Sequence, residues 1–240
     1  MRTLLLFDID GTLILSGRAG LRALNRAFED VTGVADAFHG INAAGRTDGY
    51  LLDEAARRAG FALTPEHRQA LQARYFETLV EEIQLPGEGR KAVMPGVRPL
   101  LAALSGRDDV VLALLTGNFE QSARIKLEYF DLWTPFRFGA FADDASDRNR
   151  LVPIALGRAR EAGCEPHADR VIVIGDTPLD IECAQAGGVR AVGVATGSHS
   201  RAELRDAGAD DVLEDLSETD RVVEMLVGGS VWESNPSRPR

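Results

Sequence analysis

Four nearly continuous apolar runs divide the chain, at residues 3–7, 110–115, 171–174 and 191–194. Each run ends in a cluster of polar or small residues. Runs rich in Val, Ile and Leu are typical of strands buried on both faces, as in a parallel sheet. Helical patterns separate the runs, at residues 96–105, 119–129, 151–162, 179–186 and 201–206. This alternation predicts an α/β fold built on a doubly wound parallel sheet.

One long segment between the first two runs interrupts this alternation. Its apolar residues recur with helical spacing, which gives each helix one apolar face, and no strand is expected in it. We therefore expect residues 16–89 to form an all-helical cap domain. Residues 1–15 and 90–227 then form the α/β core domain, and residues 228–240, which contain Gly, Ser and Pro, form a disordered tail.

The first apolar run ends in two carboxylates, Asp8 and Asp10, followed by Gly11. Alternation along a strand puts both acids on one side, and open α/β sheets bind ligands at the carboxyl ends of their strands. Two acids this close repel each other, so a fold that keeps them together is expected to use them to bind a cation or to transfer a proton. The competing interpretation is an exposed turn without chemistry, because Asp and Gly favour turns.

Two further strand ends carry polar groups. Thr116, Gly117 and Asn118 follow the second run, and the Thr hydroxyl and Gly N–H suit a phosphate oxygen. The alternative for Asn118 is an N-cap of the next helix, whose N-terminus would itself attract an anion. Asp176 follows the third run, and Asp180 comes four residues later.

Composition narrows the function classes. A formal net charge of −10 argues against a nucleic-acid-binding protein, which usually carries a basic patch. Two cysteines, Cys164 and Cys183, are too few for a disulfide scaffold and predict a cytoplasmic protein. Asp8 interrupts the N-terminal apolar run too early for a signal peptide, and no run reaches the roughly 18 residues that a membrane helix needs.

The motifs Asp-x-Asp-Gly-Thr, Thr-Gly-Asn and Gly-Asp-Thr-Pro-x-Asp occur in this order, each after an apolar run. Together they resemble the haloacid dehalogenase superfamily of Mg²⁺-dependent phosphohydrolases, in the branch with a helical cap after the first strand. The resemblance implies a Rossmann-like sheet, with Asp8 as the nucleophile that forms an aspartyl-phosphate and Asp10 as the acid and base. It also implies catalytic or phosphate contacts through Thr116, Gly117 and Asn118.

The same resemblance implies a Mg²⁺ site. In the family the metal is held by the first Asp, the backbone carbonyl of the second Asp and an Asp of the last motif. These positions are Asp8, Asp10 and Asp176 here, with Asp180 as a further ligand or as a partner of the ligands. Carboxylate oxygens suit this hard cation, which offsets the repulsion when one anion attacks another.

One family motif departs from its usual form. It is usually a lysine before the last-motif helix, but the two lysines of this chain, Lys91 and Lys126, lie elsewhere. We expect Arg148 to replace it, with Arg150 as the second candidate, because a guanidinium fork suits phosphate oxygens. The alternative for Arg148 is a solvated loop arginine.

A polar loop, Gly45-Arg46-Thr47-Asp48, lies between helical patterns of the expected cap. Loops on a rigid scaffold often select ligands, so Arg46 and Thr47 are expected to contact the leaving group of the substrate. The alternative is that Thr47 or Asp48 caps the next helix.

The sequence therefore predicts a Mg²⁺-dependent, phosphoglycolate phosphatase-like enzyme that acts on a small phosphorylated metabolite. It predicts a monomer or homodimer with no nucleic-acid or membrane partner. A phosphomutase of the β-phosphoglucomutase type shares the motifs and stays open. A haloacid dehalogenase is less favoured because it needs neither Asp10 nor a metal. A receiver-like signalling module, phosphorylated on aspartate, would not need the helical insert.

Overall fold

The computed structural model describes residues 2–228 and is centred on a six-stranded parallel sheet in the order β5-β4-β1-β6-β7-β8. The strands are β1 (Thr3–Phe7), β4 (Val110–Leu115), β5 (Gly139–Ala140), β6 (Val171–Gly175), β7 (Arg190–Val194) and β8 (Asp211–Leu213). The first apolar run lies in the middle, with β4 on one side and β6 on the other. The predicted doubly wound α/β fold is confirmed.

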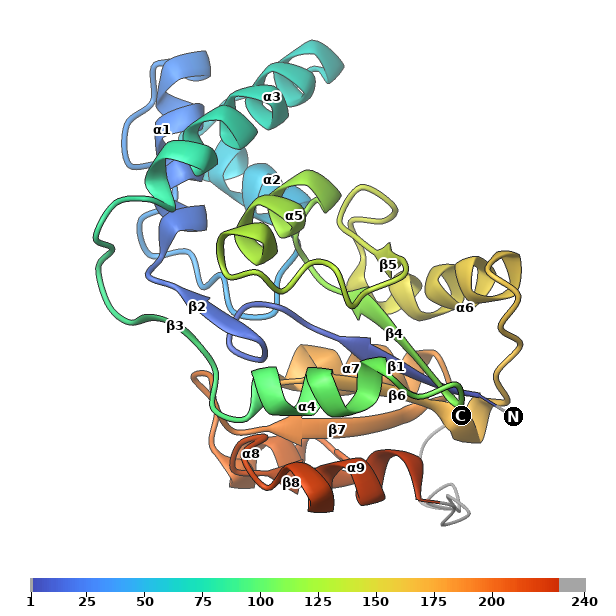
Figure 1. Cartoon of the computed structure of the whole chain (residues 1–240). Helices are drawn as coiled ribbons and strands as arrows, with labels where there is room; N and C mark the ends of the chain where they lie inside the picture. Colours follow the sequence, from blue (N-terminus) through green and yellow to red (C-terminus); the bar gives the residue numbers. More distant parts are fainter. Residues whose placement is uncertain (1, 229–240) are drawn as a thin grey trace.

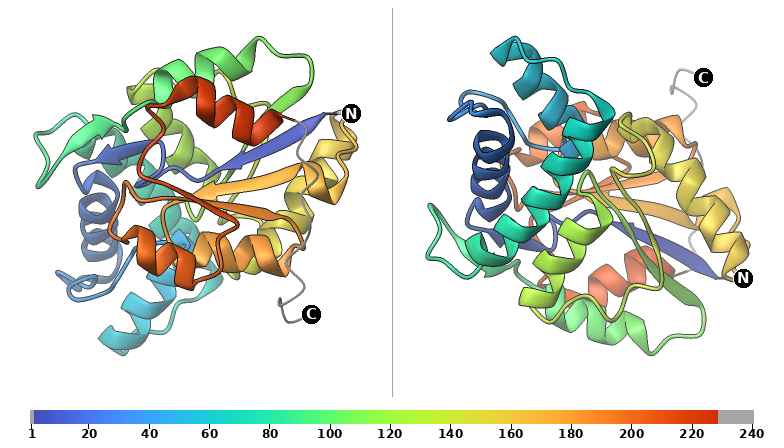
Figure 2. Two further views of the ribbon diagram at one scale, coloured as in Figure 1. Left: turned by 90° about the horizontal axis from the view of Figure 1, so that it is seen from below. Right: turned by 90° about the horizontal axis from the view of Figure 1, so that it is seen from above.

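Successive residues of β1 point to opposite faces of the sheet. Leu5 and Phe7 pack into one hydrophobic cluster, and Leu4 and Leu6 pack into another. Helices that cover the first cluster are α4 (Val97–Ser105), α5 (Glu120–Tyr129) and α9 (Thr219–Val227). Helices that cover the second are α6 (Leu151–Glu161), α7 (Pro178–Ala186) and α8 (Arg201–Asp206). Figure 2 (left) shows helices on both sides of the strands.

Three helices form a layer beyond the carboxyl ends of the strands (Figure 1): α1 (Ala19–Thr32), α2 (Asp48–Ala59) and α3 (Pro65–Glu82). Their apolar faces meet in a third cluster that includes Phe28, Tyr75 and Leu79. Phe119, which precedes α5, belongs to the same cluster. The helical layer is therefore packed directly onto the sheet domain.

Two short strands, β2 (Ile14–Ser16) and β3 (Lys91–Val93), pair antiparallel where the chain enters and leaves the helical layer. The sequence did not predict them, nor the short edge strands β5 and β8, because two or three residues cannot show a strand period. The division of the chain into core and cap stays a prediction, and β2 and β3 lie at its expected boundaries.

The expected tail at residues 228–240 lies outside the described residues, apart from Gly228. Within residues 2–228, no helix combines the length and the apolar character needed to cross a membrane.

Candidate active site

Asp8, Thr116 and Asp176 each follow one of three neighbouring strands. Because β4, β1 and β6 are parallel and adjacent, the residues that follow them meet at one edge of the sheet. A cavity of about 660 Å³ lies there, between the sheet edge and the helical layer, and all three residues line it. The structure thus brings together three motifs that are far apart in the sequence.

Asp8, Asp176 and Asp180 form a buried acidic cluster, in which one carboxylate oxygen of each lies within 4.8 Å of the others. Burial, with the neighbouring carboxylates, raises the pKa of Asp8 to about 7 despite the opposing Arg148, and raises the pKa of Asp176. Asp8 and Asp176 each keep one oxygen, Oδ2, without a hydrogen bond among the described residues. This set of acids fits a hard divalent cation, which would offset the repulsion between them.

Asp180 differs from the other two acids because both of its oxygens are engaged. Its Oδ2 accepts hydrogen bonds from the backbone N–H of Thr177 at 3.0 Å and from the Thr177 hydroxyl at 2.7 Å, and its Oδ1 pairs with Arg148. Of its two expected roles, further ligand or partner of the ligands, this geometry favours the second, because Asp180 holds Arg148, which contacts Asp8.

Arg148 reaches the acidic cluster from the short 3₁₀ helix η1 (Arg148–Arg150). Its Nη2 donates to Oδ1 of Asp8 at 3.0 Å and pairs with Asp180, and its Nη1 donates to the carbonyl of Gly45 at 3.0 Å. Arg148 is buried, whereas Arg150 is exposed. Arg148 is therefore the arginine that the structure places beside Asp8.

Asp10 turns away from the acidic cluster, toward Asn118 and Lys126. Its Oδ2 accepts from Asn118 Nδ2 at 2.8 Å and from Lys126 Nζ at 2.6 Å, and Lys126 also donates to Asn118 Oδ1 at 2.6 Å. Burial opposes the charge of Lys126, but Asp10 and Asp48 outweigh it and raise the pKa of the lysine. Asp10 therefore lines the cavity as a second carboxylate, which is paired with a buried cation.

Thr116 and Gly117 line the same cavity as Asp8 and Asp10. The Thr116 hydroxyl accepts from the Asn118 N–H at 3.3 Å and from Asn118 Nδ2 at 2.8 Å. Among the described residues it donates to no acceptor, so its own proton is available for a ligand oxygen, as the phosphate-binding prediction requires.

A family model described as haloacid dehalogenase-like hydrolase matches residues 5–185. The chain belongs to this family. Phosphoglycolate phosphatase from Rhodospirillum rubrum is 31% identical over 214 residues, which cover 88% of this chain and 87% of that protein. "Probable phosphatase IndB" from Dickeya dadantii is 28% identical over 218 residues, which cover 91% of this chain and 92% of that protein. The crystal structure of a hydrolase from Pseudomonas syringae has the same fold, with a TM-score of 0.67 and 24% identity over 94% of this chain and 99% of that chain.

The predicted membership of the haloacid dehalogenase family is thus confirmed. The sequence did not predict the part that Lys126 takes in the site of this hydrolase. Lys126 received no role from the sequence, although Asn118, Ser122 and Lys126 recur every four residues, as one helix face would. Nothing in the sequence indicates that this face meets Asp10, 116 residues earlier in the chain. The alternative N-cap role of Asn118 is wrong, because Phe119 is the N-cap and α5 begins at Glu120.

Asp48 of the helical layer supplies the contacts that a cap residue would make at the start of α5. Its Oδ2 accepts from the Phe119 N–H and from the Ser122 hydroxyl, both at 2.9 Å. Its own N–H donates to the Gly117 carbonyl at 2.6 Å. Burial raises the pKa of the Asp48 carboxyl to about 6, against the opposing charge of Lys126. Asp48 thus ties the helical layer to the end of β4.

Two other residues of the loop at positions 45–48 have different surroundings: Arg46 lines the cavity, and Thr47 contacts the start of α2. Arg46 is exposed, lines the cavity and lies 4.7 Å from the centre of the Tyr50 ring. Thr47 Oγ1 accepts from the Tyr50 N–H at 3.1 Å and donates to the Ser146 carbonyl at 3.0 Å. Thr47 therefore caps α2, as the alternative interpretation has it, and is not among the cavity-lining residues. A Cβ at Gly117 would collide with the Arg46 carbonyl, so glycine lets this loop approach β4.

Only one of the two candidate arginines is expected to matter for catalysis. Arg148→Ala should lower kcat/KM by about a hundredfold, because Arg148 touches Asp8 at the place where charge develops. Arg150→Ala should leave kcat/KM within about twofold, because Arg150 is exposed. Steady-state kinetics and thermal unfolding of both variants check this, with Arg148→Lys included to retain a charge beside Asp180. The reverse order of losses would assign the family motif to Arg150.

The buried carboxyl of Asp48 should make stability depend on pH. Its folded-state pKa of about 6 lies above the ordinary value of 3.8, so the folded state binds the proton more tightly than the unfolded state does. The free energy of unfolding should therefore fall as the pH rises from about 4 to about 6. Asp48→Asn removes the charge and keeps an oxygen acceptor for both donors. We expect it to raise the free energy of unfolding by about 3 kcal/mol at pH 8 and to leave it nearly unchanged near pH 4. Denaturant unfolding at both pH values checks this, and a loss of stability at pH 8 would contradict it.

Proposed function

We propose that this haloacid dehalogenase-like hydrolase is a Mg²⁺-dependent phosphatase that cleaves a small phosphate monoester through an aspartyl-phosphate on Asp8. One observation carries the proposal: two carboxylates with different surroundings face one cavity. Asp8 lies beside Asp176 and Arg148, whereas Asp10 forms a hydrogen-bonded ion pair with Lys126. The reaction needs a nucleophile near a cation and a separate group that moves protons. Relatives at 31% and 28% identity are named as phosphatases.

In the first half of the reaction, a carboxylate oxygen of Asp8 attacks phosphorus and the bond from phosphorus to the leaving oxygen breaks. Asp10 gives that oxygen a proton, so that an alcohol departs. The Thr116 hydroxyl and the Gly117 N–H donate to phosphoryl oxygens, and Arg148 offsets their negative charge. When bound by Asp8, Asp176 and the backbone carbonyl of Asp10, Mg²⁺ would reduce the repulsion between the two anions.

In the second half, Asp10 takes a proton from a water molecule, whose oxygen attacks phosphorus. The bond between phosphorus and Asp8 breaks, inorganic phosphate leaves and the Asp8 carboxylate is restored. Asn118 and Lys126 hold the Asp10 carboxylate in one position through both halves.

The phosphomutase alternative uses the same residues but returns the phosphoryl group to a second hydroxyl. A requirement for a sugar bisphosphate activator would favour it, whereas steady phosphate release without an activator contradicts it. Dehalogenation gives the Asp10–Lys126 pair no task, because no leaving alkoxide needs a proton.

The test of the proposal is phosphate release from 4-nitrophenyl phosphate with Mg²⁺ and with a chelator, using Asp8→Asn as the blank. We expect turnover that needs Mg²⁺ and is lost in the variant. Turnover that survives chelation would contradict the metal requirement. Absence of phosphate release from this ester and from a panel that includes phosphoglycolate would contradict the phosphatase activity.

Cys164 and Cys183 are both buried free thiols. Unpaired thiols suit a reducing compartment, so we propose that the enzyme is cytoplasmic. Its proposed oligomeric state is a monomer or homodimer.

A further inference from the structure

The active-site cavity extends beyond the phosphate site into the helical layer. Leu21 and Leu24 of α1, Ile41, and Leu51 of α2 give it an apolar wall there, while the charged side chains of Arg18, Arg46 and Arg90 also line the cavity. Because the proposed mechanism holds the phosphoryl group at Asp8, these side chains are left to contact the leaving group. An apolar wall around the leaving group favours an apolar alcohol.

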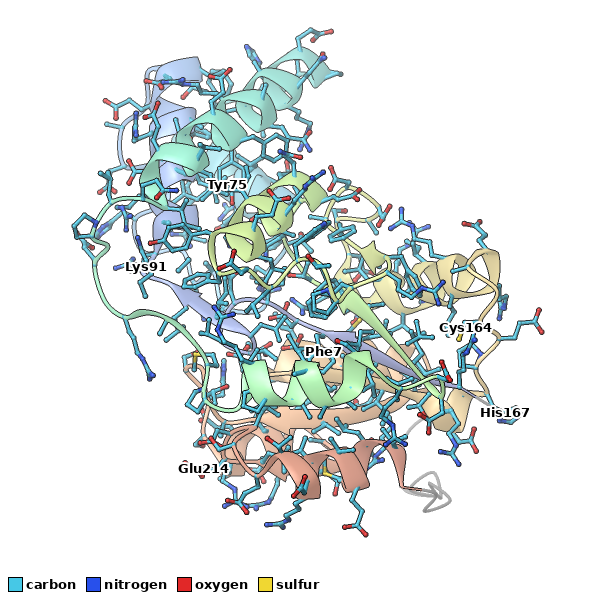
Figure 3. The ribbon with its side chains drawn as sticks, in the orientation of Figure 1. Phe7, Tyr75, Lys91, Cys164, His167 and Glu214 are labelled. Atoms are coloured by element: carbon cyan, nitrogen blue, oxygen red, sulfur yellow. The ribbon has the colours of Figure 1, made fainter. Side chains whose placement is uncertain are left out.

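Tyr75 of α3 brings a hydrogen-bond donor to this apolar part of the cavity. Figure 3 shows it between the helical layer and α5, and its side chain is 0% exposed. Tyr75 is one of the cavity-lining residues, and its buried hydroxyl makes no hydrogen bond of ordinary geometry among the described residues, although Asp48 and Ser122 lie near it. A buried hydroxyl without a partner is unfavourable, and a ligand oxygen that accepts from it would remove this cost.

The groups around Tyr75 indicate which kind of oxygen suits it. Asp48 and Lys126 lie nearby but are committed to other partners, Asp48 to the start of α5 and Lys126 to Asp10. Burial, followed by the charges of Asp48 and Asp10, raises the pKa of Tyr75 well above its usual value, so its hydroxyl keeps its proton. A ligand carboxylate would meet the charge of Asp48, whereas a neutral carbonyl or hydroxyl oxygen would not.

Gly20 of α1 keeps the space between the two parts of the cavity open. A Cβ at this position would lie 3.2 Å from Lys126 Nζ and 3.4 Å from Tyr75 Oη. A side chain at position 20 would therefore crowd both Lys126 and the Tyr75 hydroxyl.

We propose that the natural leaving group is a bulky, mostly apolar alcohol, aromatic or cyclic, with a neutral hydrogen-bond acceptor that Tyr75 binds. This inference rests on the proposed phosphatase function and narrows its substrate class. A volume of about 660 Å³ lies within the roughly 300–1,000 Å³ of pockets that enclose drug-sized ligands. Phosphoglycolate would occupy a small part of it and leave Tyr75 without an acceptor. Tyr75 is therefore a specificity-determining residue, and compact esters, which fill little of the cavity, are poor substrates.

The first arm of the test compares alkyl esters of similar intrinsic reactivity: ethyl phosphate, phosphoglycolate and 2-phenylethyl phosphate. We expect the phenylethyl ester to have a kcat/KM about tenfold or more above the two compact esters, because added apolar groups contribute transition-state binding in an apolar pocket. Equal or better hydrolysis of phosphoglycolate would overturn the proposal.

The second arm isolates the Tyr75 hydroxyl. Acetyl groups at the 3 or 4 position of the phenyl ring add a neutral carbonyl without changing the leaving oxygen. Tyr75→Phe should lower kcat/KM for the better acetylated ester by about fivefold, mainly through KM, and leave 2-phenylethyl phosphate within about twofold. Tyr129→Phe, at a half-exposed position of α5, is the matched control and should change neither. An equal effect of Tyr75→Phe on both esters would overturn the role of the hydroxyl.

Failure of the phosphatase function would look different, because no ester would then release phosphate. Calorimetric binding of the corresponding non-hydrolysable phosphonates tests the subsite in that case. A preference for the acetylated phenylalkyl phosphonate over phosphonoacetate, reduced by Tyr75→Phe, would support the subsite without the activity. Absence of that preference would overturn the subsite as well.

Discussion

Asp8→Asn is expected to reduce phosphate release by about a thousandfold or more while the fold stays intact. The amide has nearly the same shape as the carboxylate but cannot attack phosphorus. It also removes one of three clustered like charges, and burial already raises the pKa of Asp8 to about 7. The variant should therefore unfold at a temperature no lower than the wild type, although it loses the ion pair with Arg148.

Steady-state kinetics and thermal unfolding measure both parts of this expectation. Acid quenching of the wild type during turnover, followed by mass spectrometry, should also find phosphate on the peptide that contains Asp8. Asp53→Asn on α2, an exposed position, is the matched control and should keep full activity. Substantial activity in Asp8→Asn, or a phosphorylated peptide elsewhere, would contradict the nucleophile assignment.

Asp10→Asn should give the second largest loss, about a hundredfold to ten-thousandfold, with a size that depends on the leaving group. An alkoxide needs a proton as it departs, whereas nitrophenolate leaves without one. Formation of the aspartyl-phosphate should therefore fall steeply for an alkyl ester and little for 4-nitrophenyl phosphate. Its hydrolysis should be slow with either ester, because the same side chain activates water.

Rapid-quench measurement of the phospho-enzyme separates the two steps. With 4-nitrophenyl phosphate, Asp10→Asn should show a burst of nitrophenolate followed by slow turnover and accumulation of the phospho-enzyme. Thermal unfolding is the necessary control, because Lys126 is buried and loses its charged partner in this variant. Equal losses on both kinds of ester, with no burst, would remove the acid and base role from Asp10.

Much of the architecture was predictable because its signals are local. Apolar runs mark the central strands, and Asp8, Thr116 and Asp176 each stand directly after one of them. Helical spacing indicated apolar faces on α1 to α3, and these faces meet in the third hydrophobic cluster. Strands of two or three residues could not be predicted, because so short a segment shows no alternation of apolar and polar residues.

Within the site, the sequence predicted which residues stand at the strand ends, and the tertiary structure decided what each of them touches. Arg148 and Arg150 are two residues apart, and only the turn of η1 directs one to Asp8, 140 positions earlier, and the other to the surface. Lys126 meets Asp10 across 116 residues, and Asp48 joins the start of α5 across 71.

The tertiary structure likewise decides that Tyr75 lines the cavity and that its hydroxyl is buried. By itself, the sequence determined the strands, the turns that end them and the chemical groups placed there, because these depend on neighbours along the chain. The partner, burial and charge of each group depend on segments that packing brings together, and the order of residues along the chain does not record those contacts.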